Sequence, residues 1–143
     1  MQSRCADGAD DGEAPVGGSL IIGDGGSTHE RMVHQLTTGT CSGALFTDDV
    51  RCPVHVVDLA AAVSEIAFSD AADVLHLAGP DGLNRHELGV LIAQRDGLDA
   101  TGLPTGLREE SSLRGAIAVR LDSRATQQRL HTRLRGARQF LER

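Results

Sequence analysis

The sequence predicts an α/β fold, because short apolar runs alternate along it with capped, amphipathic stretches. An apolar run at residues 19–22 ends at Gly23, and Ser27 or Thr28 is then placed to cap a helix. A second run, residues 54–57, leads directly into an alanine-rich stretch. A third run precedes Asn84, which caps a stretch with its large apolar residues on one face. Repeated strand–helix pairs of this kind are typical of α/β proteins.

The same signals set the bounds of each element. Gly39 and Gly97 are placed to end helices, and Pro53 suits the start or edge of a strand because it has no N–H to donate. Strands are predicted at residues 19–22, 44–46, 54–57, 74–78 and 119–121. Helices are predicted at residues 28–38, 58–67, 85–95, 123–130 and 134–141, with Asp58 as the N-cap of the second.

The composition allows one domain with a core of aliphatic side chains. Hydrophobic residues make up 40% of the 143-residue chain, but there are only three Phe and neither Trp nor Tyr. Residues 1–18 are rich in Gly, Asp and Ala and have no periodicity, which predicts a disordered leader. The ordered domain is therefore expected at residues 19–143.

Charge and composition also exclude some partners. The net charge of −6 argues against non-specific nucleic-acid binding, which depends on neutralising phosphates. The arginines near the C-terminus have no aromatic neighbours for base stacking and are interpreted as a solvated helix face. No apolar run approaches the length needed to span a membrane. The absence of a signal peptide and an odd number of cysteines without C-x-x-C spacing predict a cytoplasmic protein with reduced thiols.

Four segments resemble, in order and spacing, the C-terminal half of the extended short-chain dehydrogenase/reductase superfamily. They are Ser-Leu-Ile-Ile-Gly at 19–23, Val-Arg-Cys-Pro-Val-His-Val-Val-Asp-Leu-Ala at 50–60, Val-Leu-His-Leu-Ala-Gly at 74–79 with Leu-Asn-Arg-His-Glu-Leu at 83–88, and Leu-Arg…Val-Arg-Leu-Asp-Ser at 113–123. The third resembles a strand and helix of dTDP-4-dehydrorhamnose reductase-like proteins, and the fourth resembles the family's Arg-Pro…Leu-Asp-Ser segment. The resemblance covers nearly all of residues 19–141 and implies a Rossmann-like fold with its N-terminal, cofactor-binding half missing.

The resemblance implies an enzyme family that transfers hydride between NAD(P)H and a keto-sugar, but this sequence lacks the parts that perform that chemistry. It holds no Tyr and no Lys, so the family's catalytic Tyr-x-x-x-Lys pair is absent, as is its Gly-rich cofactor loop. No catalytic and no cofactor-binding residue is therefore predicted. We expect a domain that binds a dTDP- or UDP-linked sugar and is inactive alone, with NAD(P) belonging to the full-length family.

Arg51 is the first predicted substrate-binding residue, since the resemblance places it at the diphosphate of the nucleotide-sugar. A planar guanidinium suits this role because it offers two parallel donors to phosphate oxygens. The alternative is a surface arginine paired with Asp48 or Asp49. Arg114 has the same predicted role, although Gly115 replaces the family's proline after it.

Three further residues complete the predicted substrate-binding set: Asp48, Pro53 and His55. His55 alternates with valines along its predicted strand, so it faces the opposite side and either contacts the sugar or is a structural histidine.

No metal site is predicted, because His29 and His34 are five residues apart and do not share a helix face. The segment Gly23–Ser27 is interpreted as a turn, with a phosphate-cradling loop as the alternative.

Two other functions stay open at this point. One is a non-catalytic module: a nucleotide-sugar sensor, or an assembly subunit that meets a protein partner or itself through the sheet region left exposed. Exposed apolar surface would favour this reading. The other is a truncated gene product without independent function.

Overall fold

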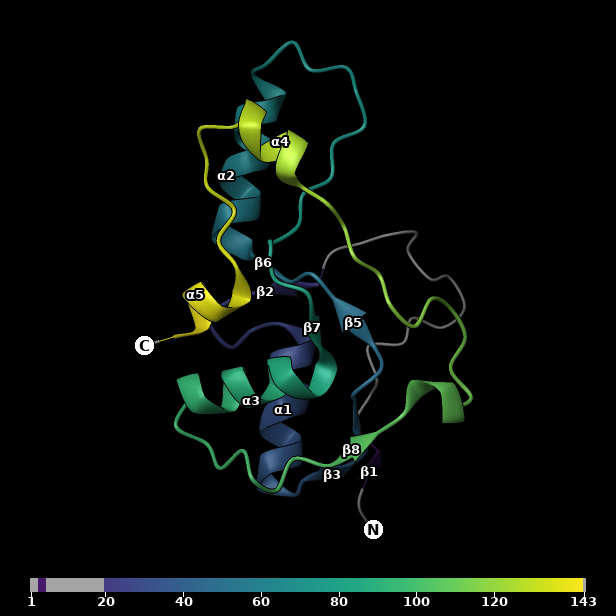
Figure 1. The fold of residues 1–143 in the computed structure, drawn as a ribbon. Coiled ribbons are helices and arrows are strands. Elements are labelled where there is room, and N and C mark those ends of the chain that lie inside the picture. The colour runs from purple at the N-terminus through teal and green to yellow at the C-terminus, as the bar shows by residue number, and fades with distance from the viewer. Residues whose placement is uncertain (1–2, 5–19, 143) are drawn as a thin grey trace.

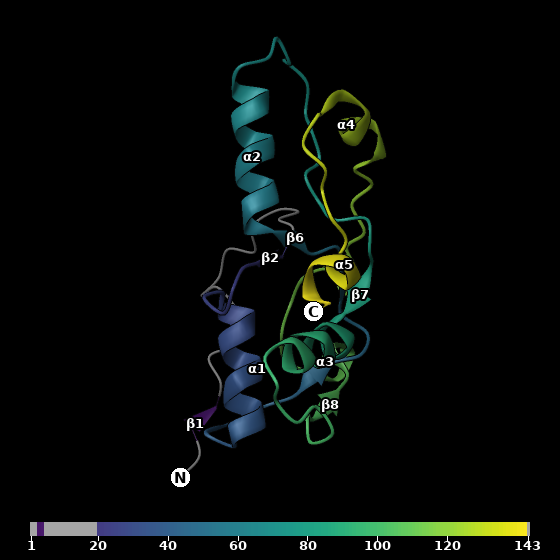
Figure 2. The same cartoon turned by 90° about the vertical axis from the view of Figure 1, so that its left-hand side faces the viewer.

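The computed structural model describes residues 3–4, by their backbone, and residues 20–142. The leader predicted at residues 1–18 otherwise lies outside the described residues. The fold is mixed α/β, as the sequence predicts, and is elongated (Figure 1). Turned by 90°, the structure shows α2 and α1 one above the other, with α3 lying across α1 and α5 between the two ends (Figure 2).

The strands are short and pair two by two. Three pairs are parallel: β1 (Ser3–Arg4) with β3 (Cys41–Ser42), β2 (Ile21–Ile22) with β6 (Val54–His55), and β4 (Leu45–Phe46) with β8 (Thr105–Gly106). The fourth pair, β5 (Val50–Arg51) with β7 (Leu83–Asn84), is antiparallel. Val50 also bridges Ala118 in parallel, so β5 lies between β7 and the 117–119 segment.

Helix α1 (Thr28–Thr38) begins and ends where the sequence predicts. Ser27 is its N-cap, and Ser27 and Glu30 form a capping box. Gly39 ends the helix in the left-handed conformation, with φ at 71°, which glycine adopts without steric cost.

The side chain of Glu30 also fills the Gly23–Ser27 turn. Its carboxylate is fully buried and accepts N–H groups from Gly23, Gly25 and Ser27 at 3.2, 2.9 and 3.0 Å. Arg95 donates to the same carboxylate at 2.7 Å and to the Gly23 carbonyl at 2.7 Å. The turn interpretation of this segment is therefore right, and the anion that its N–H groups bind is Glu30.

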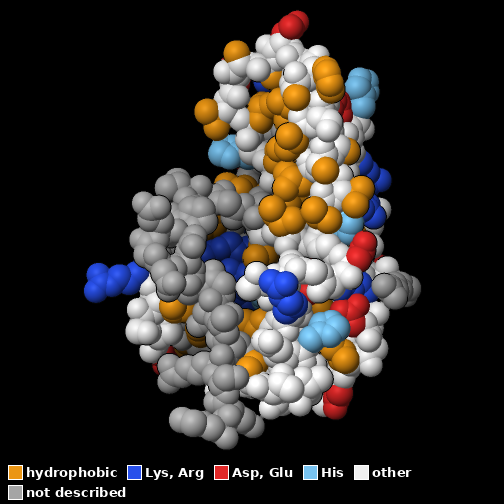
Figure 3. All heavy atoms as spheres, turned by 180° about the vertical axis from the view of Figure 1, so that it is seen from behind, with side chains coloured by type: hydrophobic (Ala, Val, Ile, Leu, Met, Phe, Trp, Pro, Cys, Tyr) orange, Lys and Arg blue, Asp and Glu red, His pale blue; other side chains and the backbone are white. Residues whose placement is uncertain are grey.

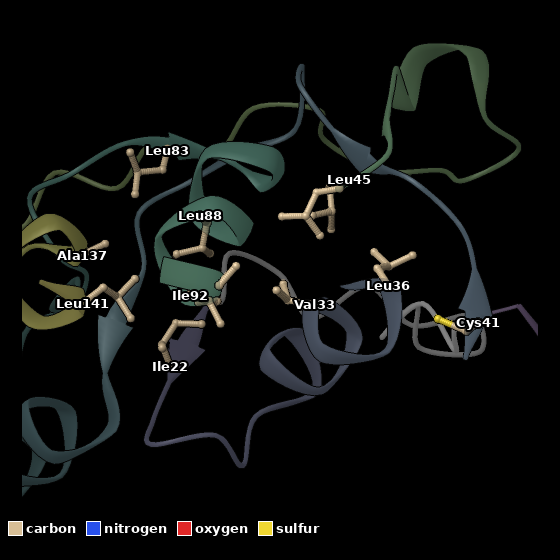
Figure 4. Close-up of a cluster of buried hydrophobic side chains, with 12 residues drawn as sticks. Ile22, Val33, Leu36, Cys41, Leu45, Leu83, Leu88, Ile92, Ala137 and Leu141 are labelled. Atoms are coloured by element: carbon tan, nitrogen blue, oxygen red, sulfur yellow. The ribbon is translucent and has the colours of Figure 1, made fainter. Parts of the chain in front are cut away.

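The larger apolar cluster lies around α3 (Arg85–Arg95), which packs on α1 and on α5 (Ala137–Leu141). Asn84 caps α3 with Glu87 in a second capping box. Figure 4 shows the aliphatic side chains pointing toward one another from these helices and from β2, β4 and β7. They include Ile22, Val33, Leu45, Leu83, Leu88 and Ile92, each at most 1% exposed.

The other end of the molecule is built from α2 (Val56–Ala67) and α4 (Arg124–Arg129) with a small cluster of Val54, Ala62 and Leu134. Asp58 is not the N-cap that the sequence predicts. His55 is the N-cap, since its Nδ1 accepts the Val57 N–H at 3.2 Å. Asp58 lies inside the first turn of α2 and accepts N–H groups from Arg135, whose guanidinium Nη2 is 2.9 Å away.

Three sequence predictions are wrong. The strand expected at residues 119–121 does not form, and only Ala118 beside it makes an isolated bridge, to Val50. No strand forms at residues 74–78: Val74 is 86% exposed and the Ala78 N–H donates to the Ser123 hydroxyl, at 2.9 Å, instead of to a neighbouring strand. Cys41 is disulfide-bonded, so the thiols are not all reduced as predicted, although Cys52 is free and buried.

Gly79 lies where three chain segments cross. A Cβ atom there would collide with the Pro53 carbonyl oxygen and lie 3.2 Å from the Arg135 carbonyl oxygen. Both neighbours are backbone atoms, so only glycine fits at this crossing.

Because His29 is buried in the first turn of α1, we expect the protein to lose stability in mild acid. Burial lowers its pKa to about 3, and Arg85 lowers it further although Glu30 raises it. Its Nε2 atom is buried without a hydrogen-bond partner among the described residues. As the pH falls below about 6.5 the unfolded chain takes up a proton that the folded chain refuses, so stability is lost progressively below that pH.

We expect the free energy of unfolding to fall with a slope of up to about 1.4 kcal/mol per pH unit between roughly pH 6 and 4. Urea titrations at several pH values measure this slope. His29→Gln should flatten it, whereas His76→Gln, at an exposed position, should not. An unchanged slope in His29→Gln would contradict the assignment.

Candidate functional site

Asp49 lies at the centre of a cluster of three arginines. Its side chain is 4% exposed. Arg51 Nη1 is 2.6 Å from its Oδ1 atom, while Arg85 Nε and Arg108 Nη1 are 3.2 and 3.1 Å from its Oδ2 atom. Asp49 is the end residue of the turn before β5, Arg85 opens α3, and Arg108 opens the short 3-10 helix Arg108–Glu110. One buried carboxylate thus faces three guanidinium groups.

Arg51 is held by this cluster and by backbone carbonyls. Its Nη1 atom donates to the Val50 and Ile117 carbonyls at 2.8 and 3.1 Å, and its Nη2 atom donates to the Ala116 carbonyl at 3.0 Å. Burial lowers the pKa of Arg51, Asp49 raises it, and the positive charges of Arg85 and Arg108 lower it further. The ion pair with Asp49 is the alternative contact that the sequence allowed.

Two more residues of the predicted set lie around the same cluster. The carboxylate of Asp48 accepts the N–H groups of Arg108 and Glu109 at 2.7 and 3.0 Å. These bonds outweigh the effect of desolvation and lower the pKa of Asp48. The Arg114 carbonyl accepts from Arg108 Nη2 at 2.8 Å, while the Arg114 side chain is exposed. Gly115 has a φ of 110°, which the proline of the resembling family could not adopt.

Pro53 and His55 are buried in the middle of the molecule. His55 caps α2, and its ring meets Phe140 edge to face with 5.2 Å between centroids. Its Nε2 atom is 3.8 Å from the exposed carboxylate of Asp24. The carbonyl of Pro53 faces Gly79. These contacts are structural, and the substrate-binding role of both residues stays a prediction.

A pocket opens next to β5. Its volume of about 870 Å³ is within the range of small-molecule binding sites. Its walls come from Cys52, from the 78–82 loop and from the segment between Arg120 and Gln139. Of the predicted substrate-binding residues, none lines it, although Cys52 lies between Arg51 and Pro53 in the chain. Three arginines do line it: Arg120, Arg124 and Arg133.

Sequence reasoning missed these arginines because they lie far apart along the chain and share no motif. Arg124 and Arg133 belong to the C-terminal group interpreted as a solvated face, and Arg120 follows an apolar stretch. No sequence signal points to them, because the approach of Arg120 to Gly82 becomes evident only from the structure.

Within residues 20–142, no group of three or more His, Cys, Asp or Glu side chains is arranged to hold a metal ion. No helix in that part of the chain has the length and apolar character needed to cross a membrane.

The fold is mixed α/β with parallel strand pairs, and it resembles the fold of a Rossmann-like reductase. It resembles the crystal structure of dTDP-4-dehydrorhamnose reductase from Bacillus anthracis in complex with NADP, with a TM-score of 0.72 and 11% sequence identity. The likeness covers 86% of this chain and 44% of the reductase chain, so this chain spans less than half the length of that enzyme. No protein-family model matches the sequence. No curated protein matches it either.

Proposed function

We propose that this chain binds a nucleotide-sugar as the substrate half of a reductase of the dTDP-4-dehydrorhamnose reductase type. The fold that it shares with that enzyme is the observation that carries the proposal. An arginine-lined pocket next to β5 supports it, because nucleotide-sugars carry a diphosphate and arginines bind phosphate oxygens in pairs. We place the protein in the cytoplasm as part of the same proposal.

In this proposal the chain positions substrate and does not transfer hydride. Neither Tyr nor Lys is present to donate a proton or tune its pKa. The Gly23–Ser27 turn, the segment most like a phosphate cradle, is filled by the Glu30 carboxylate, so no cofactor role is proposed for it. Holding a substrate in a reactive geometry is nevertheless a large share of catalysis, and it is the share proposed here.

Arg51 acts in this scheme by positioning the pocket wall. It binds the carbonyls of residues 116 and 117, and the segment continues to Arg120 at the pocket. Arg114, Asp48, Pro53 and His55 remain proposed members of the site.

Thermal unfolding with and without ligands tests the function. A ligand that binds only the folded chain at 100 times its Kd stabilises it by about 2.7 kcal/mol. We expect dTDP- or UDP-sugars to raise the melting temperature, NADPH to leave it unchanged, and Arg51→Ala to abolish the rise. A rise with NADPH alone, or NAD(P)H turnover by the pure chain, would overturn the proposal.

A second candidate function is an assembly module, and the outer face of α2 favours it. This face consists of Val56, Val57, Ala60, Ala61, Val63, Ser64, Ala67 and Phe68, all exposed. The acidic residues of α2 point the other way: Asp58 binds Arg135, and Glu65 accepts the backbone N–H groups of His131 and Thr132. Figure 3 shows the resulting band of hydrophobic side chains along this end of the molecule.

Contiguous apolar surface of this kind is typical of interfaces. The proposed occupant is a chain that supplies the part of the reductase fold that the likeness does not cover, since the likeness extends over 44% of the reductase chain. Binding of an apolar dye checks whether the face is available: Val57→Glu and Val63→Glu should reduce it, and Ser112→Glu, at an exposed position elsewhere, should not. No dye binding by the wild-type chain would remove the support for this candidate.

A further inference from the structure

The pocket beside Cys52 carries uncompensated positive charge. Of its three arginines, Arg124 is paired with Asp122, whose Oδ2 atom is 2.6 Å from Arg124 Nη2. Arg120 and Arg133 form no hydrogen bond and no ion pair with any described residue. Asp122 is the only acidic residue among those lining the pocket. Two guanidinium groups are therefore available to a ligand.

The Arg120 side chain extends over Gly82 at the pocket wall. Its guanidinium lies directly over Gly82, so closely that a Cβ atom on residue 82 would collide with Nη1. Gly82 has no positive φ that would require glycine. The missing side chain leaves room for the Arg120 guanidinium in this position.

Some neutral polar side chains in the pocket form hydrogen bonds within the chain, and others do not. Gln127 is fixed, because its amide donates to the Thr132 carbonyl and accepts the Leu134 N–H, both at 2.8 Å. The Ser123 hydroxyl accepts the Ala78 N–H. Gln128 and Gln139 are exposed at the rim and have no hydrogen bond with a described residue. Two arginine and two glutamine side chains that line the pocket thus have hydrogen-bond donors free for a ligand.

Asp81 has its carboxylate close to the pocket lining, and this carboxylate already accepts a hydrogen bond. It lies against Gly136, which lines the pocket, and accepts the Arg138 N–H at 3.1 Å. Asp81 therefore does not pair with Arg120 or Arg133.

We infer that Arg120 and Arg133 bind the diphosphate of the ligand in this pocket. A guanidinium presents paired N–H donors that match two phosphate oxygens, and the pair of cations matches the charge of a diphosphate. The pocket volume of about 870 Å³ leaves room for groups on both sides of it. The inference rests on the proposed function, because it assigns the anionic part of the nucleotide-sugar to two residues outside the set that the sequence predicted.

Calorimetric titration with inorganic pyrophosphate and with dTDP-glucose tests the inference. Arg120→Gln and Arg133→Gln should each weaken binding of both ligands roughly 10- to 100-fold, the usual cost of a lost charged hydrogen bond. Gly82→Ala should weaken it in the same direction by displacing the Arg120 guanidinium, while both arginines remain. Arg129→Gln is the matched control, since it removes one positive charge on α4 outside the pocket.

Alkylation of Cys52 gives a readout located in the pocket. Bound pyrophosphate should slow modification of this thiol, followed by peptide mass mapping, because Cys52 is a wall residue. Protection in the wild-type chain that is lost in Arg120→Gln supports the inference.

The outcomes separate the inference from the function. If dTDP-glucose binds and neither arginine substitution weakens it, or Arg129→Gln weakens it equally, the inference is overturned and the proposed function stands. If pyrophosphate binds through Arg120 and Arg133 but nucleotide-sugars do not, the anion site is supported and the proposed function fails. If neither ligand binds, both are overturned.

Discussion

Replacing Glu30 with alanine should lower the free energy of unfolding by roughly 3–5 kcal/mol, the typical effect of removing one partner of a buried ion pair. The Arg95 side chain, which is 5% exposed, would then keep Asp96 as its one carboxylate partner beside the Gly23 carbonyl. Three backbone N–H groups of the Gly23–Ser27 turn would lose their acceptor. Chemical denaturation at neutral pH measures this loss. Glu110→Ala is the matched control, since Glu110 is exposed.

The same network of Glu30, Arg95 and Asp96 determines how the free energy of unfolding falls at low pH. Desolvation raises the pKa of Glu30, but hydrogen bonds from Ser27, Arg95 and Gly23 outweigh it and hold the pKa at about 2. Bonds from Arg95, against desolvation, likewise lower the pKa of Asp96 to about 2. Their contribution is fully present above the unfolded pKa values near 4 and is lost as the pH falls toward 2. A Glu30→Ala chain as stable as wild type at pH 7 would contradict this account.

Replacing Asp49 with asparagine should also destabilise the chain by roughly 3–5 kcal/mol, because Arg51, Arg85 and Arg108 lose their shared carboxylate. The change keeps the shape of the side chain, so the effect reports charge. Denaturant titration measures it, with Asp70→Asn as the control at an exposed position.

An anion should restore part of that stability. Phosphate or sulfate should raise the melting temperature of Asp49→Asn more than that of the wild-type chain, since three guanidinium groups would then be available to bind it. Equal rises in both proteins would show that the arginines do not depend on Asp49 for their neutralisation.

The sequence predicts well those elements whose signals are local. The capping boxes of Ser27 with Glu30 and of Asn84 with Glu87 need only four consecutive residues, and both helices begin there. Gly39 ends α1 because glycine adopts the left-handed conformation there without steric cost, which is also a local signal. The strand at residues 74–78 fails because an apolar run becomes a strand only when another strand lies beside it, and none does.

The site is predicted less well because it depends on contacts between distant segments. The pattern around Arg51 lies on β5, beside Cys52 of the pocket wall. It does not say that Arg51 would bind carbonyls 65 and 66 residues away. Arg120 gains its place from Gly82, and His55 caps α2 where the sequence suggests Asp58. In each case the deciding partner comes from packing and not from a motif.

The crossing at Gly79 couples the unfolding of the two apolar clusters. The smaller cluster, around Val54 and Leu134, has too few buried side chains to hold α2 and α4 in place by itself. Yet the segments that carry it run past Gly79 with backbone against backbone, and they reach the larger cluster through the pairing of β6 with β2 and through α5. Neither end of the molecule can unfold without separating the segments that cross at Gly79, and the other end needs the same segments to stay folded. The protein should therefore melt in one step, and heat should release both ends together.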